Sequence, residues 1–291
     1  MPHGDGSIVP PPARARREMI DLHLHTTASD GRSSPARLVE EAAAAGLTTI
    51  AVTDHDTVAA TREIAERCAA RGMRAVSGIE ITAIRNGHDV HVLGYFLDAT
   101  HDELLAFLAA QRRDRIARAE AIGRLLASAG LVIDLAPLVD GARRNDGRSL
   151  GRPQIARALV EAGHVADTRE AFDVWLGEGR PAFVPRSGAP PERVIEIIHA
   201  AGGVASLAHP ATTAIDGEIA ALRSAGLDAL EAYHSDHPPE IRDRYLQLAR
   251  QLDLLVTGGS DYHGDPAHGL APGSVTLPQD EWARLALRAK L

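Results

Sequence analysis

The segment MIDLHLH, residues 19–25, alternates apolar and polar side chains and ends in a pair of histidines. A period of two is typical of a β-strand, and it places His23 and His25 on the same side of that strand. Six more short apolar segments follow, at 48–54, 74–81, 88–97, 203–209, 228–234 and 254–261. Helical patterns lie between or beside them, at 34–45, 61–71, 191–201, 215–225 and 239–252. This alternation predicts an α/β fold with parallel strands, and seven strands predict a (β/α)7 barrel.

The connection after the fourth strand is too long for a loop. Residues 101–187 contain helical patterns at 102–129, 152–162 and 168–176. We therefore expect a helical cap, inserted between strands four and five of a barrel that comprises residues 19–100 and 188–291. Residues 1–18 combine a proline cluster with several arginines, and we expect a disordered tail there.

Composition narrows the class of protein. The 291 residues include no apolar run near the roughly 20 that a membrane helix needs, and the start lacks a signal-peptide pattern. A cytoplasmic monomer is the expectation. The net charge of -8 argues against a stable complex with nucleic acid, because neutralising phosphates needs a basic surface. The single lysine, Lys290, is almost the last residue, which excludes lysine chemistry from the core.

Side chains that bind metals or carry protons recur where the predicted strands end. They are His23 and His25, with Asp30 in the next loop; Asp54, His55 and Asp56; Glu80; His91; His209; His234; and Asp261 and His263. In closed β/α barrels, active sites gather at the C-terminal ends of the strands. Taken alone, each of these side chains could have a purely structural role, as a helix cap, a turn residue or the partner of an arginine. Their recurrence beside apolar strand interiors favours a metal site instead.

The donor types indicate which ions the site would take. Imidazole and carboxylate without thiolate suit manganese, zinc or iron, and manganese is the ion we expect. One ion takes about four to six ligands, so this many side chains predict two or three divalent ions. A carboxylate such as Glu80 could bridge two of them.

Six segments together resemble the PHP family, the polymerase and histidinol phosphatase superfamily of distorted seven-stranded β/α barrels. They are DLHLH (21–25), TDHD (53–56), GIE (78–80), HVLG (91–94), AHP (208–210) and GSDYH (259–263). The resemblance implies a first metal on His23, His25, Glu80 and Asp261. It also implies a second metal on Glu80, His91 and His209, and a third on Asp30, His55 and His263. Asp30 stands where many members carry histidine, which leaves the affinity and identity of the third metal open.

The inserted segment resembles the subgroup of small phosphoesterases that act on nucleotides, including 3′,5′-bisphosphorylated nucleotides and short RNA ends. In that subgroup the insert covers the metal centre. Substrate phosphate is then expected on Arg152 and Arg157, in GRPQIAR (151–157), and on Arg180, in GRPAF (179–183). Guanidinium suits phosphate, but each arginine could also be a solvated surface cation. Gln154 replaces a histidine common there, which leaves the substrate open.

These features predict a hydrolase acting on phosphoric ester bonds. A hydroxide shared by two ions would attack phosphorus in line, with Glu80 and Asp261 holding the ions. His234 or His263 would assist the leaving group, and His234 could instead contact substrate or support a ligand. The aromatic content of 3% favours a mononucleotide or a chain end over a long single strand.

Three other functions remain open. A histidinol-phosphatase-type enzyme would use the same site on another small phosphate ester. A C–N-cleaving amidohydrolase is disfavoured, because the only lysine is terminal. A non-catalytic metal-binding module would bind ions without turnover.

Overall fold

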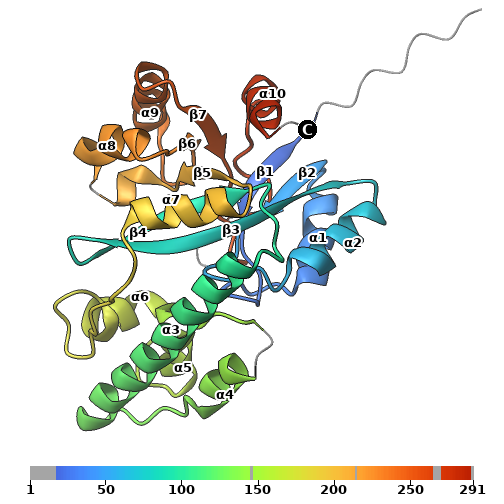
Figure 1. The fold of residues 1–291 in the computed structure, drawn as a ribbon. Helices are drawn as coiled ribbons and strands as arrows, with labels where there is room; N and C mark the ends of the chain where they lie inside the picture. The colour runs from blue at the N-terminus through green and yellow to red at the C-terminus, as the bar shows by residue number, and fades with distance from the viewer. Residues whose placement is uncertain (1–17, 145–146, 214, 265–269, 290–291) are drawn as a thin grey trace, which may run out of the picture.

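The computed structural model describes residues 18–144, 147–213, 215–264 and 270–289, so nearly all of the predicted tail lies outside the described residues. One sheet contains seven strands in chain order: β1 (Ile20–Leu24), β2 (Thr49–Val52), β3 (Arg74–Arg85), β4 (His88–Tyr95), β5 (Val204–Leu207), β6 (Ala229–Tyr233) and β7 (Leu255–Gly258) (Figure 1). The last strand returns to the first, since Leu24 pairs with Tyr262 and the His25 N–H donates to the Tyr262 carbonyl at 3.0 Å. The sheet is nearly closed, which confirms the distorted (β/α)7 barrel.

The helices around the barrel lie close to their predicted positions. They are α1 (Pro35–Ala44), α2 (Thr61–Ala69), α7 (Pro191–Ala200), α8 (Ile219–Ser224) and α9 (Pro239–Gln251). Ser34 caps α1 by accepting from the Arg37 N–H, with Pro35 in the first turn as its sequence indicates. A further helix, α10 (Gln279–Arg288), was not predicted. It buries only Trp282 and Leu285, which is too short an apolar stripe to stand out in the sequence.

The expectation of an all-parallel sheet is wrong at β4. This strand pairs antiparallel with both β3 and β5, whereas the other neighbouring strands are parallel. Asn86 and Gly87 both have positive φ, at 53° and 83°, and connect the paired residues Arg85 and His88. Asn-Gly is a strong signal for such a two-residue hairpin turn, and it marks the reversal in the sequence. The first half of β4 therefore lies at the end of the barrel where its parallel neighbours finish.

The inserted helices build a second apolar cluster. They are α3 (Asp102–Ser128), α4 (Ala136–Arg143), α5 (Arg152–Glu161) and α6 (Thr168–Ala171), followed by a π-helical turn, η1 (Phe172–Leu176). They lie together below the barrel in Figure 1. Helix α3 joins both parts, because Leu104 and Leu108 pack in the barrel core while Ile122 and Leu126 pack in the insert. This supports the predicted cap at 101–187, and the domain boundaries themselves stay a prediction.

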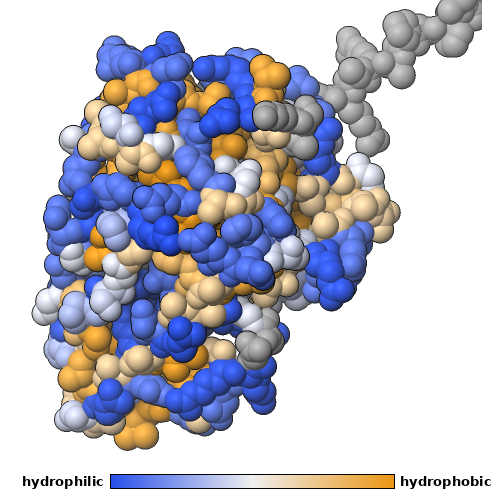
Figure 2. Space-filling view, viewed as in Figure 1, coloured by the Kyte–Doolittle hydropathy of each residue, from blue (hydrophilic) through white to orange (hydrophobic). Residues whose placement is uncertain are grey.

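The surface is mixed in character. Figure 2 shows hydrophilic side chains over most of one face, with hydrophobic side chains in separate groups. None of the helices in the described part of the chain combines the length and the apolar character that crossing a membrane requires. Buried histidine and carboxylate side chains are instead concentrated at one end of the barrel.

Candidate metal centre

Glu80 lies at the centre of a group of buried imidazoles. It sits in the middle of the long strand β3, not at its end, and its side chain is buried. Its neighbours are His23, His25, His55, His91 and His209. Its Oε2 atom lies 3.2 Å from a ring nitrogen of each of the first three, and its Oε1 atom lies 2.7 Å and 3.0 Å from the last two. One carboxylate thus touches five imidazoles from four segments of the chain.

Asp261 completes the group around His23 and His25. Its Oδ1 atom lies 3.2 Å from Nε2 of His23 and 3.1 Å from Nε2 of His25. The ligand atoms of these three residues and Glu80 all lie within 4.8 Å of one another. The four residues are those expected to hold the first metal. Behind them, the buried Asp21 carboxylate accepts from both the N–H and the hydroxyl of Ser260, which fixes the backbone before Asp261.

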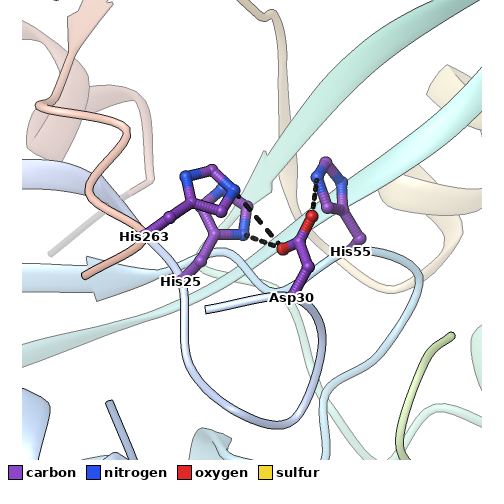
Figure 3. Close-up of side chains that lie close together, drawn as sticks. All are labelled: His25, Asp30, His55 and His263. Carbon is purple, nitrogen blue, oxygen red and sulfur yellow. Dashed lines mark ion pairs between the residues drawn. The ribbon is translucent and has the colours of Figure 1, made fainter. Parts of the chain in front are cut away.

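Asp30 gathers a second group, shown in Figure 3. Its carboxylate lies 3.3 Å from His263, 3.6 Å from His55 and 3.8 Å from His25. The turn that carries Asp30 is held by Asp54, which accepts from the N–H and hydroxyl of Thr26 and from the Ser29 hydroxyl. Asp54 was expected at the strand end among the possible ligands, but its carboxylate is engaged in shaping this turn.

The third group forms on the reversed strand. His91, Glu80 and His55 have ligand atoms within 4.8 Å, and Nε2 of His209 lies 3.3 Å from Nδ1 of His91. His91 is not at the end of its strand, because it is the fourth residue of β4. It reaches the centre because antiparallel pairing sets it opposite Thr82, two residues beyond Glu80. All nine predicted ligands therefore come together, and their assignment to individual ions stays a prediction.

The side chains of the cluster leave several polar atoms without a hydrogen bond, and bound cations would supply the missing partners. Four of these atoms are buried and make no hydrogen bond within the part of the chain that the structure describes, although they lie near one another: both ring nitrogens of His25, Nδ1 of His55 and Oδ1 of Asp261. A buried polar atom without a partner costs about 1–3 kcal/mol. Divalent ions would satisfy these atoms together. Histidine and carboxylate donors without a thiolate suit manganese, zinc or iron.

The surroundings of two histidines in the cluster shift their pKa values in opposite directions. Burial alone would lower the pKa of His25, but the carboxylates of Asp261 and Glu80 raise it to about 10. Burial lowers the pKa of His55 to about 3, against the attraction of Glu80 and Asp30. Without a metal, His25 therefore carries a proton beside a neutral His55. Because a bound cation must displace that proton, metal affinity falls as the pH falls.

Glu231, on β6, was not predicted and supports two of the predicted ligands. Its Oε1 accepts from Nδ1–H of His23 at 2.9 Å, and its Oε2 accepts from the backbone N–H of His209 at 2.8 Å. The first bond leaves the Nε2 lone pair of His23 facing Glu80 and Asp261. The second holds His209 in a backbone conformation with φ of 23°. The sequence offered one signal for this role: Glu231 is the one acidic residue within the buried segment ALEAY.

Glu231→Gln is expected to weaken metal binding about 10–100-fold, the usual cost of losing a group that orients a histidine ligand. The amide keeps the size of the side chain but accepts only through one oxygen. Competition with a chromophoric chelator measures the affinity. Glu240→Gln, the same change on the exposed start of α9, is the control and should alter nothing. Unchanged affinity in Glu231→Gln would contradict the orienting role.

His234, at the end of the barrel beside Asp261, presents a proton to the centre. Its Nδ1 accepts from the Asp236 N–H at 3.0 Å, so in the neutral ring the proton lies on Nε2, 3.3 Å from Oδ2 of Asp261. The three roles predicted for His234 are assistance to the leaving group, contact with the substrate and support of a ligand, and all three stay predictions. His263, which was also expected to assist the leaving group, has a side chain that is 29% exposed.

Four arginines line a small cavity beside the centre, between cap and barrel. They are Arg115 and Arg118 of α3, Arg152 of α5, and Arg186 in the segment that returns to the barrel. Only Arg152 was predicted. The cavity measures about 10 Å³, room for about one water, so the side chains must part to admit a larger group. The sequence signal was the spacing of Arg112, Arg115 and Arg118, which share one face of a helix.

Two buried or partly buried carboxylates only partly offset this positive charge. Asp56, expected at a strand end, faces Arg115 at 2.6 Å and Arg186 at 3.4 Å. Asp89 lies 3.4 Å from Arg152 and precedes His91 by two residues, so the cluster borders the metal centre. Burial and the neighbouring Arg115 lower the pKa of Arg186 to about 9. This excess of buried positive charge favours an anion.

The other two predicted arginines lie elsewhere. Arg157 donates to the Asp30 carbonyl at 3.1 Å and lines a different cavity, on the far side of residues 149–154. Arg180 is exposed and lines neither cavity. Their roles in binding substrate stay predictions.

Comparisons with known proteins agree with this architecture. The PHP domain model matches residues 21–252. The 5′-3′ exoribonuclease of Haemophilus influenzae is 36% identical over 84% of this chain and 89% of that protein. The 3′,5′-nucleoside bisphosphate phosphatase of Chromobacterium violaceum is 33% identical over 86% of this chain and 88% of that protein. A structure from Bifidobacterium adolescentis, described as a metal-dependent phosphoesterase, has a TM-score of 0.84 and 32% identity, over 93% of this chain and 96% of that one.

Proposed function

This chain belongs to the PHP family, and we propose that it is a metal-dependent phosphoesterase acting on nucleotides. Its substrates would be 3′,5′-bisphosphonucleotides, cleaved to a 5′-nucleotide and phosphate, or the 5′ ends of short RNAs. One observation carries the proposal: a cluster of metal ligands adjoins a separate cluster of arginines. A substrate with two phosphate groups matches this pair of sites. Relatives that act on nucleotides support it.

The ligand side chains prepare the reaction centre. The nine predicted ligands would hold two or three divalent ions, with manganese expected, and such ions supply Lewis acidity and lower the pKa of water. Arg118 and Arg152 would bind the non-reacting phosphate and fix the register of the substrate. The Nε2–H of His234 lies at the edge of the centre, where it could donate to an oxygen that develops negative charge.

The cap would cover the approach to the centre. The Gln154 side chain donates to the Ser29 carbonyl, and Arg157 donates to the Asp30 carbonyl, so α5 is fastened to the turn that carries Asp30. A closed approach excludes water and strengthens the electrostatic interactions inside.

The rival substrates differ in charge. Histidinol phosphate carries one phosphate and a cationic amine, and the excess of positive charge in the arginine cluster would repel that amine. A 3′,5′-bisphosphonucleotide presents anions to both sites. A metal-binding module without turnover would give no phosphate release on any substrate.

A phosphate-release assay with manganese tests the proposal. The panel contains a 3′,5′-bisphosphonucleotide, a 5′-mononucleotide, a short 5′-phosphorylated RNA and histidinol phosphate, with the RNA followed by product separation. We expect the bisphosphonucleotide to exceed the mononucleotide and histidinol phosphate by at least about tenfold in kcat/KM, since one charge-assisted contact contributes about 1.5–3 kcal/mol. Equal rates, or none, across the panel would refute the nucleotide proposal.

Arginine variants refine the same assay. Arg152→Ala should raise KM for the bisphosphonucleotide about 10–100-fold, through loss of a charge-assisted contact. Arg169→Ala, an exposed arginine of the cap, is the matched control and should leave KM unchanged. Arg180→Ala then decides the role of Arg180, according to which of the two variants it resembles.

A further inference from the structure

A second and larger cavity lies between the cap and the turn that follows β1. It measures about 180 Å³, is open to one side, and is lined by residues of the turn at 27–31, of α4, of the segment 148–150 and of the start of α5. A single water needs about 10–15 Å³, so this cavity has room for a group of many atoms. The mechanism described above makes no use of it.

The lining of this cavity suits a phosphorylated ligand that also has an apolar face. Its side chains include the guanidinium groups of Arg148 and Arg157, the hydroxyls of Thr27 and Ser29, and the apolar Leu138 and Ala142. Among the described residues that line it, none is acidic. Ser149, at its wall, has a buried hydroxyl without a hydrogen-bond partner among the described residues. Guanidinium and hydroxyl groups beside an apolar wall are what a phosphate, a ribose and a base require.

The position of the cavity relates it to the metal centre. Ser29 and Gly31, which line it, flank Asp30 in the sequence, and Arg157 donates to the Asp30 carbonyl at 3.1 Å. The arginine cluster adjoins the centre through Asp89 and His91, on the other side of residues 149–154. The two cavities thus border the centre next to different ligands, Asp30 and His91.

We propose that this cavity binds the nucleotide that follows the scissile phosphate of a 5′-phosphorylated RNA. The inference rests on the proposed function and extends it to a phosphodiester. Water adds its oxygen to phosphorus, the bond from phosphorus to the 3′ oxygen breaks, and that oxygen takes a proton. The first nucleotide leaves with a free 3′ hydroxyl, and the phosphate stays on the 5′ oxygen of the nucleotide in the cavity. A 3′,5′-bisphosphonucleotide has no such following group, so its turnover does not need the cavity.

Gly141→Leu tests the inference by filling the cavity. Gly141 lies on α4 in the lining, and a Cβ added there meets no heavy atom within 4 Å. Leucine also favours a helix more than glycine, so the fold should tolerate the change. We expect kcat/KM to fall at least about tenfold for a 5′-phosphorylated dinucleotide and to stay within about twofold for a 3′,5′-bisphosphonucleotide. Ala136→Leu, exposed on the same helix and outside the lining, is the control and should alter neither.

The outcomes separate the two proposals. An equal fall for both substrates in Gly141→Leu, or no fall for the dinucleotide, would overturn the cavity assignment and leave the proposed function standing. Absence of turnover of either substrate by the unaltered protein would overturn the proposed function and the inference with it. Melting temperature and metal content are measured for each variant. If Gly141→Leu melts early, Ala142→Leu, the neighbouring lining position, provides the second filling variant.

Discussion

Glu80→Gln is expected to lose most of the bound metal and to lower kcat/KM about 10³-fold or more. Glu80 contacts ring nitrogens of five histidines through its two carboxylate oxygens, so it belongs both to the group around Asp261 and to the group around His91. Glutamine has the same shape but brings no charge and only one acceptor oxygen. Metal ions contribute several kcal/mol to such reactions, and each 1.36 kcal/mol is a factor of ten in rate.

Metal content and thermal unfolding measure this effect directly. A ligand that binds only the folded state raises the melting temperature as its concentration rises. The unaltered protein should therefore melt at a higher temperature when manganese is added, and Glu80→Gln should show little of that rise. Glu240→Gln again controls for the chemical change on the surface. Full metal content together with full activity in Glu80→Gln would refute the bridging assignment.

Arg115→Ala is expected to lower the free energy of unfolding by about 3–5 kcal/mol, the range found when one partner of a buried ion pair is removed. The buried Arg115 donates to Asp56 at 2.6 Å, to the Leu150 carbonyl at 3.2 Å and to the Thr82 hydroxyl at 3.1 Å. These contacts join α3 to the barrel and to the segment before α5. Alanine leaves the fully buried Asp56 carboxylate with the longer ion pair to Arg186, at 3.4 Å, and the hydrogen bond that it accepts from the Thr82 N–H at 2.9 Å.

Urea unfolding measures this loss, with Arg113→Ala on the exposed face of α3 as the matched control. The control should change stability by no more than about 0.5 kcal/mol. Equal stability of the two variants would contradict the structural importance of the buried pair.

The pH dependence gives a second measure of the same pair. Burial would raise the pKa of Asp56, but Arg115 and Arg186 hold it below its usual value. Because the pKa in the folded state is lowered, the ionised carboxylate stabilises the fold at neutral pH, and that contribution is lost as the pH falls through the folded pKa. Without Arg115 the pKa of Asp56 rises. Acid unfolding of Arg115→Ala should therefore begin at a higher pH than that of the unaltered protein.

Local patterns were enough to predict most of the side chains that come together at the candidate metal centre. His23 and His25 follow from strand alternation, and His209, Asp261 and His263 follow from the ends of apolar segments. These positions are encoded locally, because the alternation of side chains along a strand fixes which of them share a side. The direction of β4 was also encoded, in Asn86-Gly87, although the alternation of strands and helices alone predicted a parallel strand.

Supporting residues could not be found in the same way. Glu231 is 208 residues from His23, and Arg115 is 59 residues from Asp56, so no local period relates the members of either pair. A buried carboxylate in a strand could have faced either a ligand or an arginine. Only the folded chain shows that Glu231 orients His23 while Asp54 and Asp56 hold the turn and the arginine cluster.

The sequence by itself determined the barrel, the inserted helices and the set of side chains at the metal centre, since strand period, helix signals and residue type are local properties. The tertiary structure alone decided which side chains meet. It brought five imidazoles to Glu80, set Arg115, Arg118 and Arg186 beside Arg152, and turned Arg157 toward another cavity. The physical reason is that contacts between distant segments depend on how helices and strands pack, and the cap is positioned by buried ion pairs and apolar packing that no short stretch of sequence contains.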